Sequence, residues 1–253
     1  MNEVETDFGE PIPGTVLPTD QWAKTAIKRL PPTGPLNFAD VFGRVAPVVV
    51  ELGCGNGRYT LHSALARPDH DHFASDILPV VIRYATRRAN QRGLHNVRFA
   101  VRDAQTIARE YLPAASVAEV HIYHPQPFRD PRQAHRRLIT PRFLAHVHRA
   151  LRPGGMVVVQ TDHADYWAYF TRVFPVFFEF QEAPGPWPDA PEGRSRREIL
   201  ARSRGLTIYR GWGLRRDGLA EREALVLAEA LPSPVFRSEG PWAELDAREA
   251  SHR

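Results

Sequence analysis

From residue 47 onward, short apolar runs alternate with longer stretches whose apolar residues recur at helical spacing. The strand-like runs are PVVVEL (47–52), HFAS (72–75), VRFAVRD (97–103), VAEVHIY (117–123) and GGMVVVQTD (154–162). The helical stretches are RYTLHSALA (58–66), LPVVIRYATRRANQRG (78–93), TPRFLAHVHRAL (140–151) and YWAYFTRVF (166–174). Alternating strands and helices predict a doubly wound α/β fold, in which helices cover both faces of a mostly parallel sheet.

Different patterns flank this alternating region. Residues 1–40 are rich in proline and turn-forming residues and show no sustained period, so a flexible N-terminal arm is predicted. Residues 232–253 are predicted to be a flexible C-terminal tail, which leaves 41–231 as one domain. Late in this domain, the apolar runs LTIYRGWG (206–213) and ALVLAEAL (224–231) predict an antiparallel pair at the sheet edge, preceded by an insertion.

Composition is that of an ordinary soluble globular protein, with 253 residues, 43% of them hydrophobic and 25% charged. No run is long and apolar enough to span a bilayer, and the acidic start MNEVETDFGE lacks the features of a secretion signal, so a cytoplasmic protein is expected. The lone cysteine, Cys54, excludes an internal disulfide framework and a cysteine zinc cluster. The histidines of 70/72 and 146/148 would point to different faces of a helix, so no metal site is expected.

The net charge of +4 and the pI of about 9.5 favour a polyanionic partner such as nucleic acid. A GC-rich genome would produce the same excess of arginine over lysine. The positions of the basic residues therefore have to carry the argument.

A glycine-rich loop, GCGNG (53–57), ends the first predicted strand and opens a helix. Glycines in such a loop allow a tight turn and a close approach of the backbone to a ligand. The spacing of Gly53, Gly55 and Gly57 is shorter than that of a dinucleotide-binding fingerprint. With Glu51 in the preceding strand, it resembles the first motif of class I S-adenosylmethionine-dependent methyltransferases. For the triplet alone, a tight turn without a ligand is the alternative.

Acidic residues follow two further strands of the predicted sheet. Asp76 ends the second strand, at the separation from the glycine loop where an acidic side chain accepts hydrogen bonds from a ribose diol. Asp103 and Ala104 follow the third strand, a position that contacts the adenine edge in the methyltransferase fold. An N-cap of the short helix QTIAREYL is the equal alternative for Asp103. Loop and acids together indicate S-adenosylmethionine as the cofactor.

The loop HPQPFRDPRQAHRRL (124–138) leaves the fourth predicted strand and lies at the carboxyl edge of the sheet, beside the cofactor crevice. It resembles the signature PDPWxKxxHxKRRL of bacterial tRNA (guanine-N7)-methyltransferases, through Pro125, Pro127, Phe128 and the ending RRL (136–138). The segment VVVQTDHADYW (157–167) resembles the TDxxxY segment of that family, and LTIYRGWG faintly resembles its TKFExRG motif. The resemblance covers about residues 40–230. It implies a Rossmann-like class I methyltransferase that transfers a methyl group to N7 of guanine 46 in tRNA.

This resemblance also implies an acceptor site. Guanine N7 carries a free lone pair, so attack on the methyl group needs no general base, and the catalytic residues Gln126 and Asp162 are expected to position the base by hydrogen bonds. Phe128 is expected to stack on the base. The other expected substrate contacts are phosphate-binding arginines and two positions of the TKFE segment, namely Arg129, Arg132, Arg136, Arg137, Thr207 and Arg210.

Two departures from the family pattern bear on activity: Gln126 stands where the family has an aspartate, and Arg210 where it has a glutamate. A non-catalytic RNA-binding protein and a methyltransferase for another acceptor are therefore kept as alternatives. The arginines of 129–137 have a solvated, acid-paired helix start as their alternative, and the cluster 194–204 is open between RNA contact and plain surface. A monomer is expected.

Overall fold

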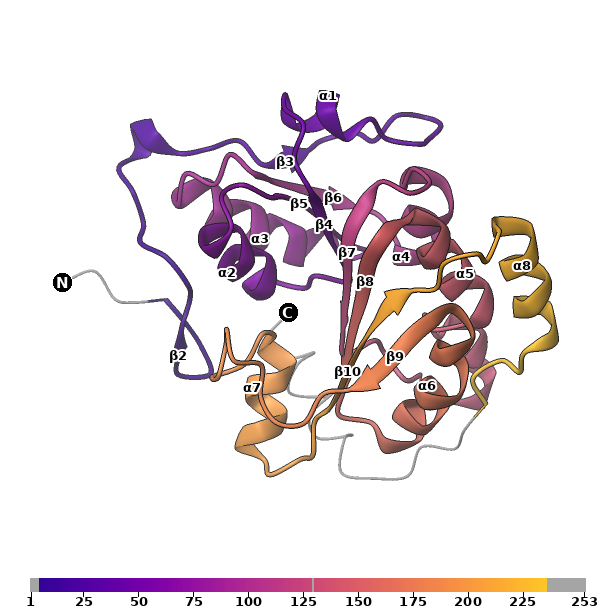
Figure 1. Ribbon diagram of the computed structural model, residues 1–253. Helices are drawn as coiled ribbons and strands as arrows, with labels where there is room; N and C mark the ends of the chain where they lie inside the picture. Colours follow the sequence, from indigo (N-terminus) through magenta and orange to yellow (C-terminus); the bar gives the residue numbers. More distant parts are fainter. Residues whose placement is uncertain (1–4, 129, 236–253) are drawn as a thin grey trace.

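The computed structural model describes residues 5–128 and 130–235. Its centre is an eight-stranded sheet in the order β3-β6-β5-β4-β7-β8-β10-β9 (Figure 1). The strands from β3 to β8 in that order are parallel, and β10 is antiparallel to both β8 and β9. Their bounds are β3 Ala26–Ile27, β4 Val48–Leu52, β5 Asp71–Asp76, β6 Val97–Val101, β7 Val117–Tyr123, β8 Leu151–Thr161, β9 Phe178–Glu182 and β10 Tyr209–Arg215. The predicted doubly wound, mostly parallel sheet with an antiparallel C-terminal edge is confirmed.

Helices cover both faces of this sheet (Figure 1). On one face α2 packs against α3, and on the other α5 packs against α6 and α8. The bounds are α1 Phe38–Phe42, α2 Arg58–Ala66, α3 Pro79–Gln91, α4 Ala104–Thr106, α5 Pro141–Ala150, α6 Ala164–Phe177, α7 Arg196–Ser203 and α8 Glu221–Ala230, with 3₁₀ or π segments at η1 Thr19–Gln21, η2 Ile107–Tyr111 and η3 Pro131–Arg136. Among the helices of the described residues, none combines the length and apolar character needed to cross a membrane.

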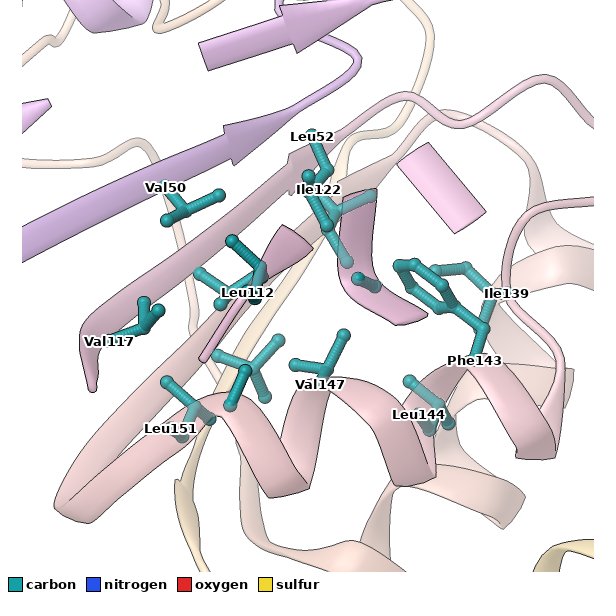
Figure 2. Packing of buried hydrophobic residues seen from close by; sticks show 14 of the residues in the cluster. Val50, Leu52, Leu112, Val117, Ile122, Ile139, Phe143, Leu144, Val147 and Leu151 are labelled. Carbon is teal, nitrogen blue, oxygen red and sulfur yellow. The ribbon is translucent and has the colours of Figure 1, made fainter. Parts of the chain in front are cut away.

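Helix α5 illustrates how the sequence pattern produces the core. Phe143, Leu144 and Val147 recur on one helical face, and Figure 2 shows this face directed at Val50 and Ile122 of the sheet. The helix starts where the Thr140 hydroxyl accepts a hydrogen bond from the Phe143 N–H at 3.2 Å and Pro141 occupies the first turn. Capping and periodicity therefore agree on the same element.

The N-terminal residues that the structure describes pack on the domain. Strand β3 extends the sheet edge by pairing in parallel with β6, and Ile12 and Phe38 are buried. A short hairpin of β1 (Thr6–Asp7) and β2 (Glu10–Pro11) carries Asp7, which is only 4% exposed. The domain boundary at residue 41 stays a prediction, as does the flexibility of the arm. Most of the predicted tail, residues 236–253, lies outside the described residues.

The composition of the antiparallel edge corrects one expectation. Strand β10 does cover most of LTIYRGWG, but its outer partner is β9, and the run ALVLAEAL forms α8 instead of a strand. Ala224 and Ala228 are four residues apart and buried on one face, and alanine, leucine and glutamate favour a helix. The predicted insertion is present between β9 and β10 and contains α7.

Candidate functional site

A cavity of about 470 Å³ opens at the carboxyl ends of β4, β5, β6 and β7. Strand order reverses between β4 and β7, and ligands of doubly wound sheets bind in the crevice at such a point. The wall is drawn from the glycine loop, the ends of β5 and β6, the loop after β7, and the start of α7. Its members include Glu51, Gly53, Gly55, Asp76, Asp103, Ala104, Gln126, Phe128, Arg136 and Asp162, all of which the sequence had singled out.

The glycine loop is fixed to the end of β5. The amides of Gly53 and Cys54 donate to the Ser75 carbonyl oxygen at 2.8 and 3.0 Å, and the Gly55 amide donates to Oδ2 of Asp76 at 3.0 Å. Gly55 has a φ of +51°, and a Cβ there would meet no atom within 4 Å. The loop therefore presents bare backbone to the cavity, as close approach of a ligand requires.

Gly57 serves packing instead of ligand approach. Its φ is +80°, and a Cβ at this position would lie 2.8 Å from Cβ of Ala85 in α3. The glycine lets the start of α2 sit against α3, although Gly57 does not line the cavity. The predicted contact of Gly57 with a cofactor stays a prediction.

Glu51 is an unusual acid for this wall because it is 4% exposed. Burial raises the pKa of Glu51 to about 8, and the hydrogen bond that its Oε2 accepts from the Thr60 hydroxyl opposes this rise. The side chain is thus largely protonated at neutral pH and has a proton to donate within the cavity.

Asp76 and Asp103 both combine a cavity position with a local backbone bond. Asp76 Oδ1 accepts from the Leu78 amide at 2.9 Å, in addition to the Gly55 bond on its other oxygen. Asp103 caps α4 by accepting from the Thr106 amide at 2.8 Å, so the capping alternative is correct as far as this bond goes. Both carboxylates nevertheless line the cavity, and their contacts with a cofactor stay predictions.

The loop after β7 holds two residues in the left-handed backbone region. His124 has a φ of +49° and Phe128 a φ of +41°, and both line the cavity. Non-glycine residues persist in this region only where the surroundings hold them. Arg137 is one such anchor. Its guanidinium donates to the carbonyl oxygens of Pro127 at 2.6 Å and Phe128 at 3.0 Å, and also to that of Pro234.

This anchoring corrects the role expected for Arg137. The residue is completely buried, so a contact with RNA phosphates, as expected from the sequence, is wrong. Its guanidinium instead fixes the loop that carries Gln126 and Phe128. Burial lowers the pKa of Arg137, although its starting value leaves the group charged.

The other arginines of this loop are differently placed. Arg136 is exposed, and its guanidinium carbon lies 4.7 Å from the centroid of the Phe128 ring. Arg132 is exposed and pairs with Asp130 at 2.8 Å, which fits the acid-paired alternative for this one residue. Arg129 lies outside the described residues. Gln126 is exposed in the cavity wall, where its amide is accessible to a ligand.

Asp162 is held between two cationic or hydrogen-bonding partners. Its Oδ1 lies 3.1 Å from Nδ1 of His124, and its Oδ2 accepts from Nε and Nη2 of Arg197 at 3.0 and 2.8 Å. Burial acts to raise the pKa of Asp162, but the hydrogen bonds and charges of His124 and Arg197 hold it well below its usual range. The carboxylate is therefore ionised and fixed in place at the cavity wall.

Arg210 and Thr207 are not where the sequence resemblance implied. Neither lines the cavity, and Thr207 is exposed outside it. Arg210 is 6% exposed and forms an ion pair of 2.6 Å with Glu198, which is completely buried. The substrate contact expected for Arg210 is thus wrong, because Arg210 ties β10 to α7. The contact expected for Thr207 stays a prediction.

Sequence reasoning missed the contribution of the α7 segment to the site. Arg194 lies over the Trp187 ring with its guanidinium carbon 4.3 Å from the centroid, and it donates to the Tyr123 hydroxyl at 2.8 Å. Arg58, at the start of α2, donates to the Gly193 carbonyl oxygen at 3.1 Å. The arginine cluster of 194–204 was the available signal, but its sequence gave no indication that this segment meets α2 and β7.

Residues 45–209 match a protein-family model described as "Putative methyltransferase". A tRNA (guanine-N(7)-)-methyltransferase from Halorhodospira halophila is 32% identical over 177 residues, which are 70% of this chain and 77% of that protein. The chain belongs to the tRNA (guanine-N7)-methyltransferase family. The family member from Alkalilimnicola ehrlichii is 30% identical over 73% of this chain and 78% of its own length, and that from Paracidovorax citrulli 33% over 62% and 64%.

Solved structures add the fold alone. The 16S rRNA methyltransferase KamB has a TM-score of 0.55 at 17% identity, covering 76% of this chain and 98% of that chain. A 16S rRNA (adenine(1408)-N(1))-methyltransferase variant with its cosubstrate SAM, from Catenulisporales acidiphilia, has a TM-score of 0.52 at 15% identity, covering 74% and 95%. The Rossmann-like class I methyltransferase fold expected from the sequence is confirmed.

The residues present fit the S-adenosylmethionine that this fold family implies. Bare backbone at Gly53 and Gly55 faces open space, and Asp76 and Asp103 follow the two neighbouring strands on the same wall. Across the cavity, the loop after β7 and the start of α7 supply a second, arginine-rich wall. Within the described residues, no group of three histidine, cysteine, aspartate or glutamate side chains could hold a metal ion.

Proposed function

We propose that this protein is an S-adenosylmethionine-dependent methyltransferase of tRNA that methylates N7 of a guanine, with guanine 46 as the expected position and the cytoplasm as the expected location. One observation supports this most. A single cavity joins a wall suited to the cofactor, around Gly55 and Asp76, to a wall suited to a base, around Gln126 and Asp162. Names of the family members supply the substrate class.

Three ionisable side chains of the acceptor wall, those of Tyr123, His124 and Asp162, already have hydrogen-bond partners within the protein. Both ring nitrogens of His124 have partners, at 3.1 Å from Asp162 and 2.8 Å from Gln160. Burial raises the pKa of Tyr123 well above its ordinary value, while the pKa of Asp162 is held low by His124 and Arg197. Such a wall suits an acceptor that loses no proton before attack, and guanine N7 is one. His135 also lines this wall, but it is exposed to solvent and is not one of the three partnered side chains.

Positioning is then the main contribution that these residues make. S-adenosylmethionine, when bound, supplies an electrophilic methyl group on its sulfonium centre. Asp162 accepts hydrogen bonds, Gln126 both donates and accepts, and each can orient an extruded guanine through its polar edge. Holding the acceptor nitrogen close to the methyl group and in line with it accounts for large rate gains without proton transfer.

Gln126 provides the test, because it stands where the family pattern has an aspartate. In single-turnover assays with labelled cofactor and unmodified tRNA, wild type is expected to form 7-methylguanine, and Gln126→Ala is expected to be slower than Gln126→Asp. Tenfold slowing corresponds to about 1.4 kcal/mol of lost transition-state stabilisation. If wild type and Gln126→Asp both bind cofactor but transfer nothing, the guanine-N7 proposal is wrong.

A further inference from the structure

Five arginines of the described residues line the cavity: Arg58, Arg136, Arg194, Arg196 and Arg197. Three of them are committed to acceptors within the protein. Arg58 donates to the carbonyl oxygens of Gly193 and Pro11, Arg194 to Asp189 and Tyr123, and Arg197 to Asp162. Their hydrogen-bonding capacity maintains the architecture of the site.

Arg136 and Arg196 are different. In the described part of the chain, neither guanidinium donates a hydrogen bond to a protein acceptor, and Nε of Arg196 is shielded from solvent without a partner. Each guanidinium is placed over a phenylalanine ring instead. The guanidinium carbon lies 4.7 Å from the ring centroid for Arg136 over Phe128, and 4.6 Å for Arg196 over Phe8. Stacking on an aromatic face leaves the planar N–H fork of arginine available at its edges.

The backbone beneath both rings is strained in the same manner. Phe8, in the turn of the β1–β2 hairpin, has a φ of +51°, and Phe128 has a φ of +41°. Bulky residues rarely adopt this left-handed region, because it is sterically unfavourable for them. Two separate loops of the chain thus hold a phenylalanine in an unfavourable backbone conformation, and each ring supports a cavity-lining arginine. A shared role for the two pairs explains both outliers.

We propose that Arg136 and Arg196 are a two-point phosphate-binding pair that grips the RNA backbone at the cavity, with Phe128 and Phe8 as their supporting shelves. This inference rests on the proposed function and adds Arg196, Phe8 and the stacked geometry to it. It also gives Phe128 a role other than stacking on the target base. An arginine fork binds a phosphate through two parallel hydrogen bonds, and a polynucleotide offers successive phosphates to two such forks. The cofactor, by contrast, carries a single carboxylate.

The test measures tRNA affinity across a salt series, using unmodified tRNA transcript and the full-length protein. Arg136→Gln and Arg196→Gln are each expected to weaken binding about tenfold and to reduce the slope of log affinity against log salt by about one, and the double variant by about two. Arg196→Lys keeps the charge but loses the fork, so it should preserve the slope while binding more weakly. Phe8→Leu removes only the aromatic ring beneath Arg196, so it should also preserve the slope while binding more weakly.

Arg222→Gln is the matched control. It makes the same change of charge at an exposed arginine of α8, which Figure 1 places on the other side of the molecule from α7. This variant should keep the wild-type slope. If wild type and the Arg136→Gln/Arg196→Gln variant have equal slopes, the phosphate pair is refuted, whether or not the protein methylates guanine.

Calorimetry with S-adenosylmethionine alone shows whether Arg196 binds RNA phosphates or the carboxylate of the cofactor. The phosphate pair predicts unchanged cofactor affinity in Arg196→Gln, and this result also shows that the variant is folded. A loss of cofactor affinity without RNA would assign Arg196 to the carboxylate of the cofactor and overturn the inference. A wild type that binds tRNA with the expected slopes but forms no 7-methylguanine would instead refute the proposed function and leave the phosphate pair standing.

Discussion

At the scale of single residues, Asp76 connects the glycine loop to the ligand that the loop is expected to hold. Its two oxygens accept from the amides of Gly55 and Leu78 at 3.0 and 2.9 Å, which leaves the remaining lone pairs available to a ribose diol. We predict that Asp76→Ala weakens S-adenosylmethionine binding by roughly 10- to 100-fold, because a hydrogen bond to a charged group contributes about 1.5–3 kcal/mol. Calorimetry measures this directly. Unchanged affinity in a folded variant would remove Asp76 from the cofactor site.

Glu51 makes a prediction about pH. Its pKa is about 8 in the folded protein, against an ordinary value of 4.5, so the folded state binds more protons than the unfolded state between these values. The free energy of unfolding contributed by Glu51 therefore falls as pH rises from 4.5 to 8 and is constant above that. Glu51→Gln removes this loss and should gain stability relative to wild type by on the order of a few kcal/mol between pH 5 and 8.5.

Urea unfolding of both proteins at pH 5, 7 and 8.5 measures this difference. Thr60 is a useful companion, because its hydroxyl donates to Glu51 and opposes the rise in pKa. In Thr60→Val the pKa of Glu51 should rise further. Parallel stability profiles for wild type and Glu51→Gln would contradict the assigned pKa.

At the scale of secondary-structure elements, one buried ion pair joins α7 to β10. Glu198 is completely buried and Arg210 is 6% exposed, and their charged atoms lie 2.6 Å apart. Removing one partner leaves a buried charge alone, so Glu198→Ala is predicted to cost about 3–5 kcal/mol of unfolding free energy. The Glu198→Ala/Arg210→Met double variant should recover part of that loss. Urea unfolding of the complete double-mutant cycle measures the coupling, and additive losses would show that the pair does not interact.

Elements were predictable from the sequence where a local rule governs them. Short apolar runs and helical spacing identified β4 to β8 and the helices α2, α3, α5 and α6, because burial on one or both faces fixes the spacing of apolar residues. The prediction of a strand at ALVLAEAL was wrong, because a short apolar run does not distinguish a strand from a helix. This run forms α8, which packs on α5. Strand β3 has two residues, too few for any period, and its place depends entirely on β6.

The same distinction applies to the site: residues at strand ends were predictable, and contacts between segments distant in sequence were not. Gly55, Asp76 and Asp103 were predictable because the carboxyl ends of parallel strands meet at one edge of the sheet. Arg197 meets Asp162 across 35 residues of sequence, and Arg58 meets Gly193 across 135. No spacing rule connects such pairs. Which arginines of a basic loop face solvent also escaped the sequence, since Arg136 and Arg137 are neighbours with opposite environments.

At the scale of the whole molecule, the distribution of charge bears on partner binding, and the buried histidines bear on the pH dependence of stability. The net charge of +4 favours a polyanionic partner, and the cavity gathers five arginines of the described residues, Arg58, Arg136, Arg194, Arg196 and Arg197. Most of that charge is balanced by internal acceptors. The pH dependence of stability is set by a different set of groups, the buried ones whose pKa differs between the folded and the unfolded state.

His72 is one such group, and it provides the final prediction. It is 1% exposed in β5, with Nε2 2.9 Å from the Ser63 hydroxyl, and burial lowers its pKa to about 3. An unfolded histidine takes up a proton near pH 6.5, whereas the folded one does not until about pH 3. The unfolded state therefore binds more protons in this window, and stability is lost as pH falls below 6.5.

The loss should reach on the order of a few kcal/mol at pH 4.5. His146, whose pKa is lowered to about 4 by burial and by nearby arginines, acts in the same direction but more weakly, because its pKa is lowered less. Glu51 acts in the opposite direction over part of the same range, so only differences between variants are informative.

We predict that His72→Gln is less stable than wild type at pH 7, since it disturbs a packed strand, yet loses less stability between pH 6.5 and 4.5. His95→Gln, at an exposed histidine, should keep the wild-type dependence. Urea unfolding at half-unit steps of pH separates the two effects, and equal pH slopes in wild type and His72→Gln would show that His72 accepts its proton without unfolding.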